Sequence, residues 1–402
     1  MMKILYYKIR AFAVKLLLRL LPRNLPVVYS GIGSSLTLCR QVPILGYSKV
    51  LVVTDTFLNG SGLLDPIMTT LAEGGVDVAV YDGVEPDPTF DQVQAGEALL
   101  RKEGCDAVIA VGGGSVLDAA KLIALMRHNP GDLKFFDGIQ KAKKPGVPLF
   151  AIPTTAGTGS ETTPASIITD AETHRKVPVA DGKLVPHYVA LDAGLMKSMP
   201  PHITAATGMD ALTHAVESWL SKASTGSTEA MAGAATRLVL QYLPRAWRDG
   251  DDMEAREAMA MASFYGGVAF GRTSVGYAHG IAHQLGRVCG TPHGDANAMV
   301  LPEVLSAYGE VVHDRLAELA RVAGLGKAGE PSAELAGRLI RAIADMRDEL
   351  GMPLKPSGLE EKDIPGIVDA ALTEAGDLYP VPRYMSPEEI RRIVEGLLPA
   401  HG

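Results

Sequence analysis

Two short segments in the second half of the chain combine acidic and imidazole side chains at helical spacing. In GMDALTHAVE, Asp210 and His214 lie four residues apart, which places them on one face of a helix. In YAHGIAHQLG, His279 and His283 have the same spacing, and TPHGDANA adds His293. A carboxylate with imidazoles is an oxygen and nitrogen donor set that suits Fe²⁺, Zn²⁺, Mn²⁺ or Co²⁺, and it contains no thiolate. The pattern predicts a metal site and leaves open which histidines bind.

A glycine-rich turn in the first half of the chain has the composition of an anion-binding site. The segment VGGGSVLDAAK, residues 111–121, follows a predicted strand and opens a predicted helix. Its glycines let the backbone approach a ligand closely, and the start of the helix directs N–H groups and a positive dipole end at a phosphate or pyrophosphate. Leu117 occupies the third position of G-x-G-x-x-G, so the segment does not match that fingerprint, and an ordinary turn is the alternative.

Two further features lie at the ends of predicted strands, where ligands of open α/β sheets bind. The loop IPTTAGTGSE, residues 152–161, carries several hydroxyl groups between glycines. Asp55 ends a predicted strand, where it can accept hydrogen bonds from a ribose diol and would repel a 2′-phosphate. The alternatives are a polar surface loop and a common turn residue.

The elements that must position these residues divide the chain into two parts. Predicted strands lie at 49–54, 76–81, 106–111, 147–152 and 188–192. Helical spacing between the first four favours a parallel sheet with crossover helices. After Pro200 the predicted elements are helices at 203–221, 228–247, 254–270, 274–288, 309–323, 332–350, 361–375 and 387–397. The predicted fold class is α/β plus all-α: a Rossmann-like parallel-sheet domain at 25–198, then an all-helical metal-binding domain at 199–402.

Composition excludes several classes of protein. The chain has 402 residues, 47% of them hydrophobic and 21% charged, which is ordinary globular usage. Its net charge of −8 argues against a nucleic-acid partner, because that binding depends on a basic face. Cys39, Cys105 and Cys289 lie far apart without C-x-x-C spacing, which predicts no disulfide framework and a cytoplasmic, reducing compartment.

The amino-terminal segment has a charge pattern of its own. Residues 1–54 contain eight basic residues and no acidic one. Helical winding of residues 3–21 gathers Leu5, Ile9, Phe12, Leu16 and Leu20 on one face, and the basic residues interrupt any apolar span. We expect residues 1–24 to form a basic amphipathic helix that docks on its own domain or on a second subunit. Attachment to an anionic membrane surface is the alternative.

With these motifs together, the chain resembles the iron-containing alcohol dehydrogenases, which include lactaldehyde reductases, 1,3-propanediol dehydrogenases and butanol dehydrogenases. The most specific matches are GGGSVLDAAK, AIPTTAGTGSET, TAATGMDALTHAVES and HGIAHQLGRVCGTPHG. The resemblance implies NAD(H)-linked hydride transfer to or from a small alcohol, diol or aldehyde. It also implies a catalytic divalent metal, usually Fe²⁺ with Zn²⁺ as the alternative, and a homodimer or larger homo-oligomer.

The resemblance further implies roles for individual residues. The implied metal ligands are Asp210, His214, His279 and His293, with His283 beside the metal as an unliganded proton relay. The implied coenzyme contacts are Gly113, Gly114 and Ser115 at the pyrophosphate with Asp118 nearby, Asp55, Thr154 and Thr155 on the adenine and ribose side, and Lys176 on the nicotinamide side.

Departures and rival interpretations concern the substrate more than the framework. Relatives commonly have Pro at position 116, where this chain has Val, and an Asn-rich segment where this chain has Phe270, Gly271, Arg272 and Thr273. A Zn²⁺-dependent glycerol dehydrogenase-like or dehydroquinate synthase-like enzyme on the same fold is the alternative function; the GTGSE loop and the PHG spacing favour the alcohol dehydrogenases. A catalytically silent scaffold is the rival from another class, and the intact ligand set argues against it.

Overall fold

The computed structural model describes residues 24–172 and 175–399. These described residues fall into two compact units, divided in the sequence between Met199 and Pro200. The amphipathic helix predicted for residues 1–24 lies, except for Asn24, outside the described residues.

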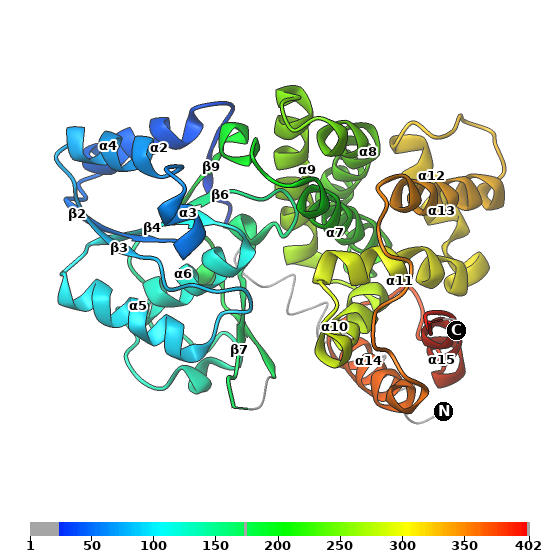
Figure 1. The fold of residues 1–402 in the computed structure, drawn as a ribbon. Helices are drawn as coiled ribbons and strands as arrows, with labels where there is room; N and C mark the ends of the chain where they lie inside the picture. The colour runs from blue at the N-terminus through cyan, green and yellow to red at the C-terminus, as the bar shows by residue number, and fades with distance from the viewer. Residues whose placement is uncertain (1–23, 173–174, 400–402) are drawn as a thin grey trace. The chain divides into compact units, whose positions relative to one another are not determined.

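The first unit is built on a six-stranded sheet (Figure 1). Its strands, in spatial order, are β1 (Val27–Ser30), β9 (Tyr188–Leu191), β6 (Leu149–Pro153), β4 (Ala107–Gly112), β2 (Lys49–Val53) and β3 (Asp77–Tyr81). All neighbouring pairs are parallel. Strands β4 and β6 are buried along their whole length, which is typical of a parallel sheet covered on both faces. The predicted parallel sheet is confirmed, and β1 is an additional strand at its edge.

Helices cover both faces of this sheet. Helices α2 (Ser34–Ile44) and α4 (Asp65–Glu73) pack together on one face, and α5 (Phe90–Lys102) and α6 (Gly114–Met126) pack together on the other (Figure 1). Between α2, α4 and the sheet lies a core that is almost fully buried and includes Leu38, Val42, Val50, Val52, Ile67, Leu71, Ile109, Phe150 and Ile152. The short helix α3 (Thr56–Gly60) follows β2. This framework fixes the ends of β2, β4 and β6, where the predicted coenzyme residues lie.

A second, three-stranded sheet in the same unit was not predicted. It has the order β5 (Gly138–Ile139), β8 (Lys176–Ala180), β7 (Ala165–Thr169), with β7 and β8 antiparallel. Pro178 in the middle of β8 argues against a strand in the sequence, because proline cannot donate a ladder hydrogen bond. Strand β5 pairs only with Val179 and Ala180, so among the described strands Pro178 has a neighbour on one side only.

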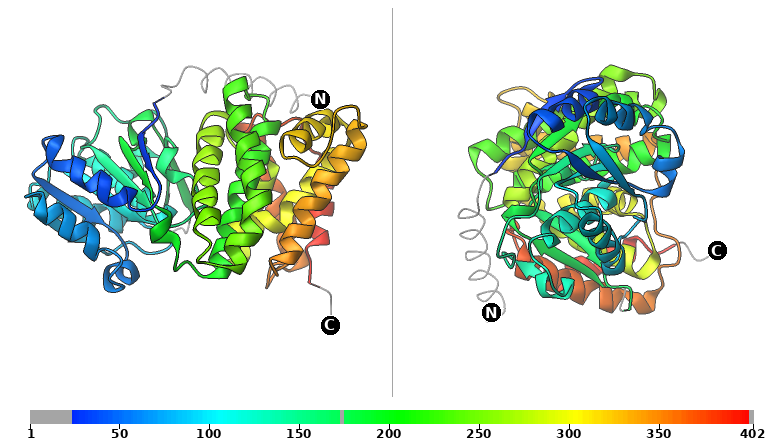
Figure 2. Two further views of the ribbon diagram at one scale, coloured as in Figure 1. Left: turned by 90° about the horizontal axis from the view of Figure 1, so that it is seen from above. Right: turned by 90° about the vertical axis from the view of Figure 1, so that its left-hand side faces the viewer.

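Residues 200–399 of the second unit form helices joined by loops, with no strand among them. Its helices are α7 (Pro201–Leu220), α8 (Gly226–Arg248), α9 (Met253–Thr273), α10 (Tyr277–Cys289), α11 (His293–Tyr308), α12 (His313–Val322), α13 (Ser332–Glu349), α14 (Ile364–Leu378) and α15 (Pro387–Gly396). Helices α8 and α9 lie side by side against α7 (Figure 2), and α11 packs against α7 and α10. The predicted helical second half is confirmed.

Helix α11 is the one long helix of this unit that the sequence did not predict. Most of its residues, from Gly294 to Tyr308, are buried, so it shows no apolar stripe with helical period. Pro302 lies inside it, and proline normally indicates a helix boundary. Both features hide a helix from a search based on amphipathic periodicity.

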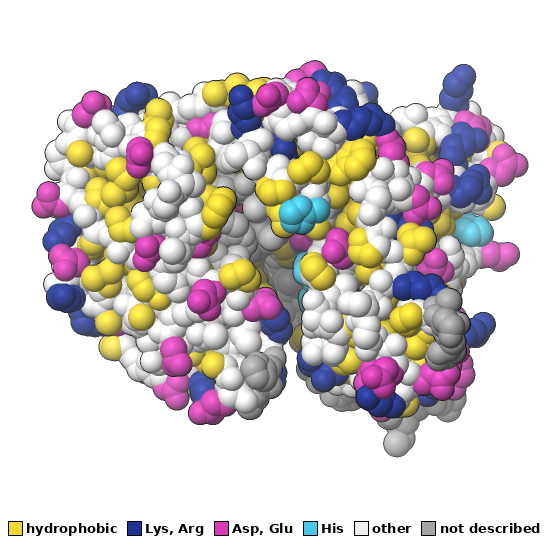
Figure 3. Space-filling model, viewed as in Figure 1, with side chains coloured by type: hydrophobic (Ala, Val, Ile, Leu, Met, Phe, Trp, Pro, Cys, Tyr) yellow, Lys and Arg dark blue, Asp and Glu magenta, His cyan; other side chains and the backbone are white. Residues whose placement is uncertain are grey.

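The surface of each unit carries charges of both signs. On the face shown in Figure 3, acidic and basic side chains are interspersed over each unit. Within the part of the chain that the structure describes, no helix combines the length and the apolar character needed to cross a membrane.

Candidate metal and coenzyme sites

Helix α7 carries the first two residues of the predicted metal site. Asp210 and His214 are buried and lie one helical turn apart. The ring of His214 is held between two other rings: Phe270 of α9 stacks on it at 3.9 Å between ring centroids, and the His279 ring lies at 4.6 Å. The orientation of His214 is therefore fixed by packing.

Helices α10 and α11 bring the other two predicted ligands to α7. His279 lies in the first turn of α10, and His293 begins α11. The next residue, Gly294, permits the close approach of α11 to α7, because a Cβ atom there would lie 2.1 Å from the backbone oxygen of Ala206. Any larger residue at this position would push His293 away from Asp210.

The four predicted ligands converge on one carboxylate oxygen. The Nε2 atoms of His293, His279 and His214 lie 3.3, 3.6 and 3.9 Å from Asp210 Oδ1. Ligand atoms of Asp210, His279 and His293 all lie within 4.8 Å of one another, which is a spacing that one metal ion can bridge. His214 joins this group through its contact with Asp210. The structure thus brings together residues that are up to 83 positions apart in the sequence, from Asp210 to His293.

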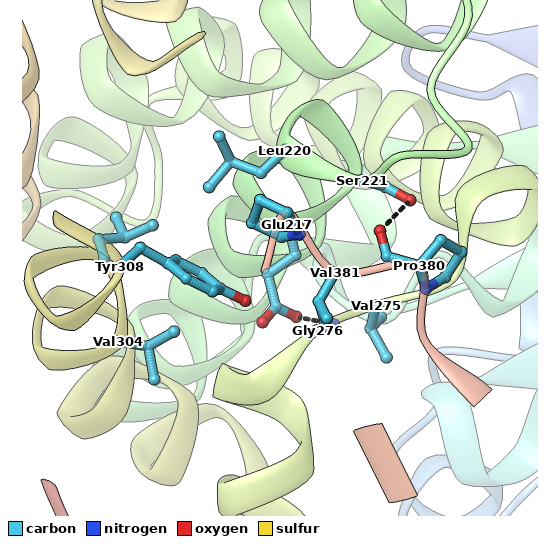
Figure 4. Close-up of a pocket in the computed structure, with 11 residues that line it drawn as sticks. Glu217, Leu220, Ser221, Val275, Gly276, Val304, Tyr308, Pro380 and Val381 are labelled. Atoms are coloured by element: carbon cyan, nitrogen blue, oxygen red, sulfur yellow. Dashed lines mark hydrogen bonds between the residues drawn. The ribbon is translucent and has the colours of Figure 1, made fainter. Parts of the chain in front are cut away.

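Glu217, which the sequence analysis did not single out, orients His279. Its carboxylate accepts a hydrogen bond from His279 Nδ1 at 2.6 Å and from the backbone N–H groups of Gly276 and Ala278 at 2.8 and 2.7 Å. A Cβ atom at position 276 would lie 2.7 Å from Glu217 Oε1, so glycine is needed there. Figure 4 shows the Glu217 carboxylate against Gly276, with Tyr308 on its other side. Because Nδ1 is bonded to Glu217, Nε2 is the ring nitrogen of His279 that faces Asp210.

Asn297 is a second neighbour that sequence reasoning missed. It lies one turn after His293 on α11 and is fully buried. Its Nδ2 donates to Asp210 Oδ1 at 2.8 Å and lies 3.2 Å from His293 Nε2. Its Oδ1 has no hydrogen-bond partner among the described residues. Asn297 therefore holds the carboxylate from the side of α11.

The electrostatics of this cluster favour a bound cation. Burial alone would raise the pKa of Asp210, but the neighbouring His214 and His293 outweigh it and hold that pKa well below its usual value. Burial alone would lower the pKa of His279, but hydrogen bonds to Asp210 and Glu217 outweigh it and raise that pKa to about 9. The field that stabilises a proton between these groups also attracts a divalent metal ion.

His283 lies beside this cluster. Its ring stacks on the His293 ring at 5.3 Å between centroids, with an interplanar angle of 16°. Its Nδ1 lies 2.6 Å from Oε1 of Glu374, a carboxylate on α14. The side chain of His283 is 39% exposed, so solvent can reach it.

The glycine-rich turn lies between β4 and α6, as predicted. Gly113 is the extended N-cap residue of α6, and no side chain caps the N–H groups of the first helical turn. The loop after β6 packs on this turn: Thr154 N donates to Gly112 O, and a Cβ atom on Gly114 would lie 2.7 Å from the Thr158 side chain. Gly113, Gly114, Ser115, Thr154 and Thr155 therefore belong to two adjoining segments at the carboxyl ends of β4 and β6.

A buried lysine ties these two segments together. Lys121 is 1% exposed, and its Nζ donates to Ser160 Oγ at 2.7 Å, Thr163 Oγ1 at 3.0 Å and the backbone oxygen of Ala165 at 2.6 Å. Asp118 accepts from Ser160 Oγ at 2.5 Å and lies 3.4 Å from Lys121 Nζ. Asp118, predicted near the pyrophosphate, has its carboxylate engaged inside the protein.

The two remaining predicted coenzyme residues are engaged in local contacts. Asp55 is the N-cap of α3, where its Oδ1 accepts from Leu58 N at 2.8 Å. Lys176, at the start of β8, forms an exposed ion pair with Asp87. Both residues lie in the first unit with the glycine-rich turn.

Four residues with clear contacts to the sites were not predicted: Lys121, Glu217, Asn297 and Glu374. Helical spacing could have identified two of them. Glu217 follows Asp210 and His214 at the i, i+4, i+7 spacing of one helix face, and Asn297 lies four residues after His293. Glu374 lies 91 residues from its partner His283, and sequence spacing carries no information about that contact.

Comparison with known proteins identifies the family. The family model described as "Iron-containing alcohol dehydrogenase" matches residues 26–193, and "Fe-containing alcohol dehydrogenase family, C-terminal" matches residues 204–398. The NAD-dependent methanol dehydrogenase of Bacillus methanolicus is 37% identical over 375 residues, which cover 93% of this chain and 98% of that protein. The 1,3-propanediol dehydrogenase of Citrobacter freundii is 39% identical over 88% of this chain and 92% of its own length.

A solved structure agrees with these matches. The crystal structure of a 1,3-propanediol oxidoreductase is similar with a TM-score of 0.89 and 36% identity, covering 93% of this chain and 98% of that chain. The chain therefore belongs to the iron-containing alcohol dehydrogenase family. The predicted family, fold class and oxidoreductase activity are confirmed, and the glycerol dehydrogenase-like or dehydroquinate synthase-like alternative is not favoured.

Proposed function

We propose that this protein transfers hydride between a small alcohol or diol and NAD, with Asp210, His214, His279 and His293 holding a divalent metal ion. Iron is the expected ion, and zinc is the alternative. The single observation that supports this most is the convergence of three imidazole Nε2 atoms on Asp210 Oδ1. The names of the methanol and propanediol dehydrogenases support a small alcohol as substrate and NAD as coenzyme.

The donor set fits such an ion. With Nδ1 of His279 bonded to Glu217, its Nε2 is left to face the Asp210 carboxylate. A divalent ion bound there would take the place of the proton that these two groups otherwise share. Three imidazoles and one carboxylate are the ligand types that would hold a borderline divalent ion.

The residues of this chain then divide the work of the reaction. When bound, the metal supplies positive charge that lowers the pKa of an alcohol, and the nicotinamide ring accepts the hydride. Asp210 and the three histidines fix the position of that charge. Glu217 and Asn297 fix the orientation of His279 and Asp210 through hydrogen bonds of 2.6 and 2.8 Å. His283, solvent-accessible and stacked on His293, takes up the alcohol proton.

The coenzyme is bound by the first unit in this proposal. The uncapped N–H groups at the start of α6, with Gly113, Gly114 and Ser115, face the pyrophosphate, and Thr154, Thr155 and Asp55 face the adenine and ribose side. Asp118 lies nearby and acts through its hydrogen bond to Ser160. Lys176 lies on the nicotinamide side, which requires it to leave its exposed ion pair with Asp87.

Several finer assignments belong to the same proposal. Residues 25–198 form the coenzyme domain and residues 199–402 the metal domain. The protein acts in the cytoplasm as a homodimer or larger homo-oligomer. The widely separated cysteines support a reducing compartment, since they give no disulfide framework.

A reconstitution assay tests the proposal. Metal-stripped protein is loaded anaerobically with Fe²⁺ or Zn²⁺ and assayed for NADH formation with C2 to C6 alcohols and diols, and for NADH consumption with the matching aldehydes. We expect turnover only in metal-loaded protein, with at least one primary alcohol. Equal turnover in the stripped protein, or no NADH with any alcohol, would contradict the proposal.

A further inference from the structure

The carboxylate of Glu374 is built into a network of its own behind His283. Oε1 lies 2.6 Å from His283 Nδ1 and also accepts a hydrogen bond from the Tyr379 hydroxyl. Oε2 accepts from Gln284 Nε2 at 3.0 Å. Both carboxylate oxygens are therefore held by donors, two from α10 and one from the segment that follows α14.

The donors themselves are fixed. Tyr379 is 7% exposed, and the backbone around it is bonded on both sides, with Lys222 N donating to Pro380 O at 2.7 Å and Val381 N donating to Tyr379 O at 2.8 Å. The Gln284 side chain accepts from Arg287 Nε at 3.0 Å, so its amide is oriented with Nε2 toward Glu374. These hydrogen bonds consequently hold the Glu374 side chain in one rotamer.

This arrangement fixes which nitrogen of His283 carries the proton. An ionised carboxylate can only accept, so Nδ1 of His283 must be the donor, and the lone pair of the neutral ring is left on Nε2. Burial alone would raise the pKa of Glu374, but the charge of His283 and the hydrogen bonds from His283 and Tyr379 outweigh it, so the pKa is lowered. The stacking of His283 on His293 fixes the plane of the ring, and the bond to Glu374 fixes its rotation within that plane.

We propose that Glu374 is a positioning residue for the reaction: it selects the tautomer of His283 in which Nδ1 is protonated and Nε2 is free to accept the alcohol proton. This inference rests on the proposed role of His283 as the proton relay. Glu374 does not touch the substrate and acts only through His283. Hydrogen bonds from Tyr379 and Gln284 keep the Glu374 carboxylate oriented toward Nδ1 of His283.

A double-mutant cycle tests this inference. The proteins compared are the wild type, Glu374→Gln, His283→Ala and the double variant, all loaded with the same metal. Glutamine keeps the size of the side chain but offers an N–H group that favours the wrong tautomer of His283. We expect Glu374→Gln to lower kcat at least about tenfold, with unchanged metal content and unchanged KM for NAD.

Non-additivity is the decisive readout. If Glu374 acts only through His283, the double variant is no slower than His283→Ala alone. A double variant slower by the product of both single effects would overturn the inference, because Glu374 would then act on something else. Loss of metal in Glu374→Gln would also overturn it and assign Glu374 a structural role.

Two outcomes separate this inference from the proposed function. If His283→Ala is slow and Glu374→Gln has wild-type kcat, the relay stands and the role of Glu374 is wrong. If His283→Ala itself has wild-type kcat, the relay is wrong and the inference falls with it. Asp369→Asn, an exposed change on the same helix, is the matched control and should leave kcat unchanged.

Discussion

The two units contain buried polar clusters of opposite kinds. In the first unit, the Lys121 ammonium is surrounded by acceptors: two hydroxyl groups, a backbone oxygen and the Asp118 carboxylate. In the second unit, the Asp210 carboxylate is surrounded by the nitrogens of three imidazole rings. Stacking on Phe270 fixes the plane of the His214 ring, and a hydrogen bond to Glu217 fixes the His279 ring. The first cluster contains a lysine as its own cation, whereas the second brings together side-chain atoms that could hold a metal ion.

This difference predicts different responses to mutation. A cluster with its own cation stabilises the fold, so breaking it should first reduce stability and then weaken coenzyme binding through the displaced loop. A cluster built of side chains that can ligate a metal ion depends on that ion, so breaking it should first reduce metal binding.

Removing His279 should have the largest effect. His279→Ala deletes a ligand atom and leaves Glu217 with a buried carboxylate that has lost one of its three donors. We expect bound metal and turnover to be lost together, measured by elemental analysis and by the NADH assay on the same sample. The exposed His128→Ala change in the first unit is the control. A His279→Ala protein that keeps stoichiometric metal would remove His279 from the ligand set.

Removing the Lys121 ammonium should mainly destabilise the first unit. Lys121→Met leaves Asp118 without its cation, and breaking a buried ion pair from one side costs about 3 kcal/mol or more. Denaturant unfolding measures this loss, and calorimetry should show weaker NAD binding with unchanged metal content. The double variant Lys121→Met/Asp118→Asn should recover part of the stability, because no unpaired charge remains. A double variant less stable than Lys121→Met would show that the two residues do not act as a pair.

The same contrast explains what could be predicted from the sequence. The strands β2, β4 and β6 and the helices α7, α8 and α13 were predicted because their apolar residues follow a clear period or form a bounded run. Helix α11 was missed because it is buried on most sides, and strand β8 because Pro178 interrupts it. An apolar residue pattern with a regular period arises when one face of an element is exposed to solvent. This pattern therefore cannot identify elements that are buried on all sides.

Site residues could be predicted where their residue types and spacing are unusual in a protein sequence. Histidines and an aspartate at helical spacing are rare enough to attract notice, and the structure brings those at 210, 214, 279 and 293 together. Glu217 and Glu374 are ordinary helix residues in sequence, and only the fold shows that each accepts a hydrogen bond from a histidine at 2.6 Å. The sequence analysis included Lys121 only as the last residue of the glycine-rich segment. Its burial could not be predicted, because its hydrogen-bond acceptors come from the loop at 158–165.

A buried carboxyl group close to Lys121 should make stability depend on pH. Glu161 is 1% exposed, its Oε1 has no hydrogen-bond partner among the described residues, and burial raises its pKa from 4.5 to about 7. The folded protein therefore holds this proton more tightly than the unfolded chain. Its contribution to the free energy of unfolding is complete below pH 4.5 and is lost, by about 3 kcal/mol, as the pH rises to about 7.

Glu161→Gln isolates this effect. The variant should be more stable than the wild type at about pH 8 by up to about 3 kcal/mol, and the difference should vanish toward pH 4.5. Denaturant unfolding at several pH values measures it, and Glu73→Gln, an exposed change in α4, is the control. A constant difference between Glu161→Gln and the wild type across this range would mean that Glu161 does not titrate there.

The smallest expected effect is that of replacing Asp55. This replacement distinguishes the role of Asp55 as the cap of α3 from its proposed role in binding the coenzyme. Asp55 caps α3 through its hydrogen bond from Leu58 N, so a change to glycine would alter both the cap and the charge. Asparagine caps a helix about as well as aspartate but carries no charge. Asp55→Asn should therefore leave stability nearly unchanged while raising kcat/KM for NADP relative to NAD severalfold, because a 2′-phosphate is no longer repelled. If the ratio stays at the wild-type value, Asp55 is a helix cap alone, and coenzyme preference is set by other residues of the first unit.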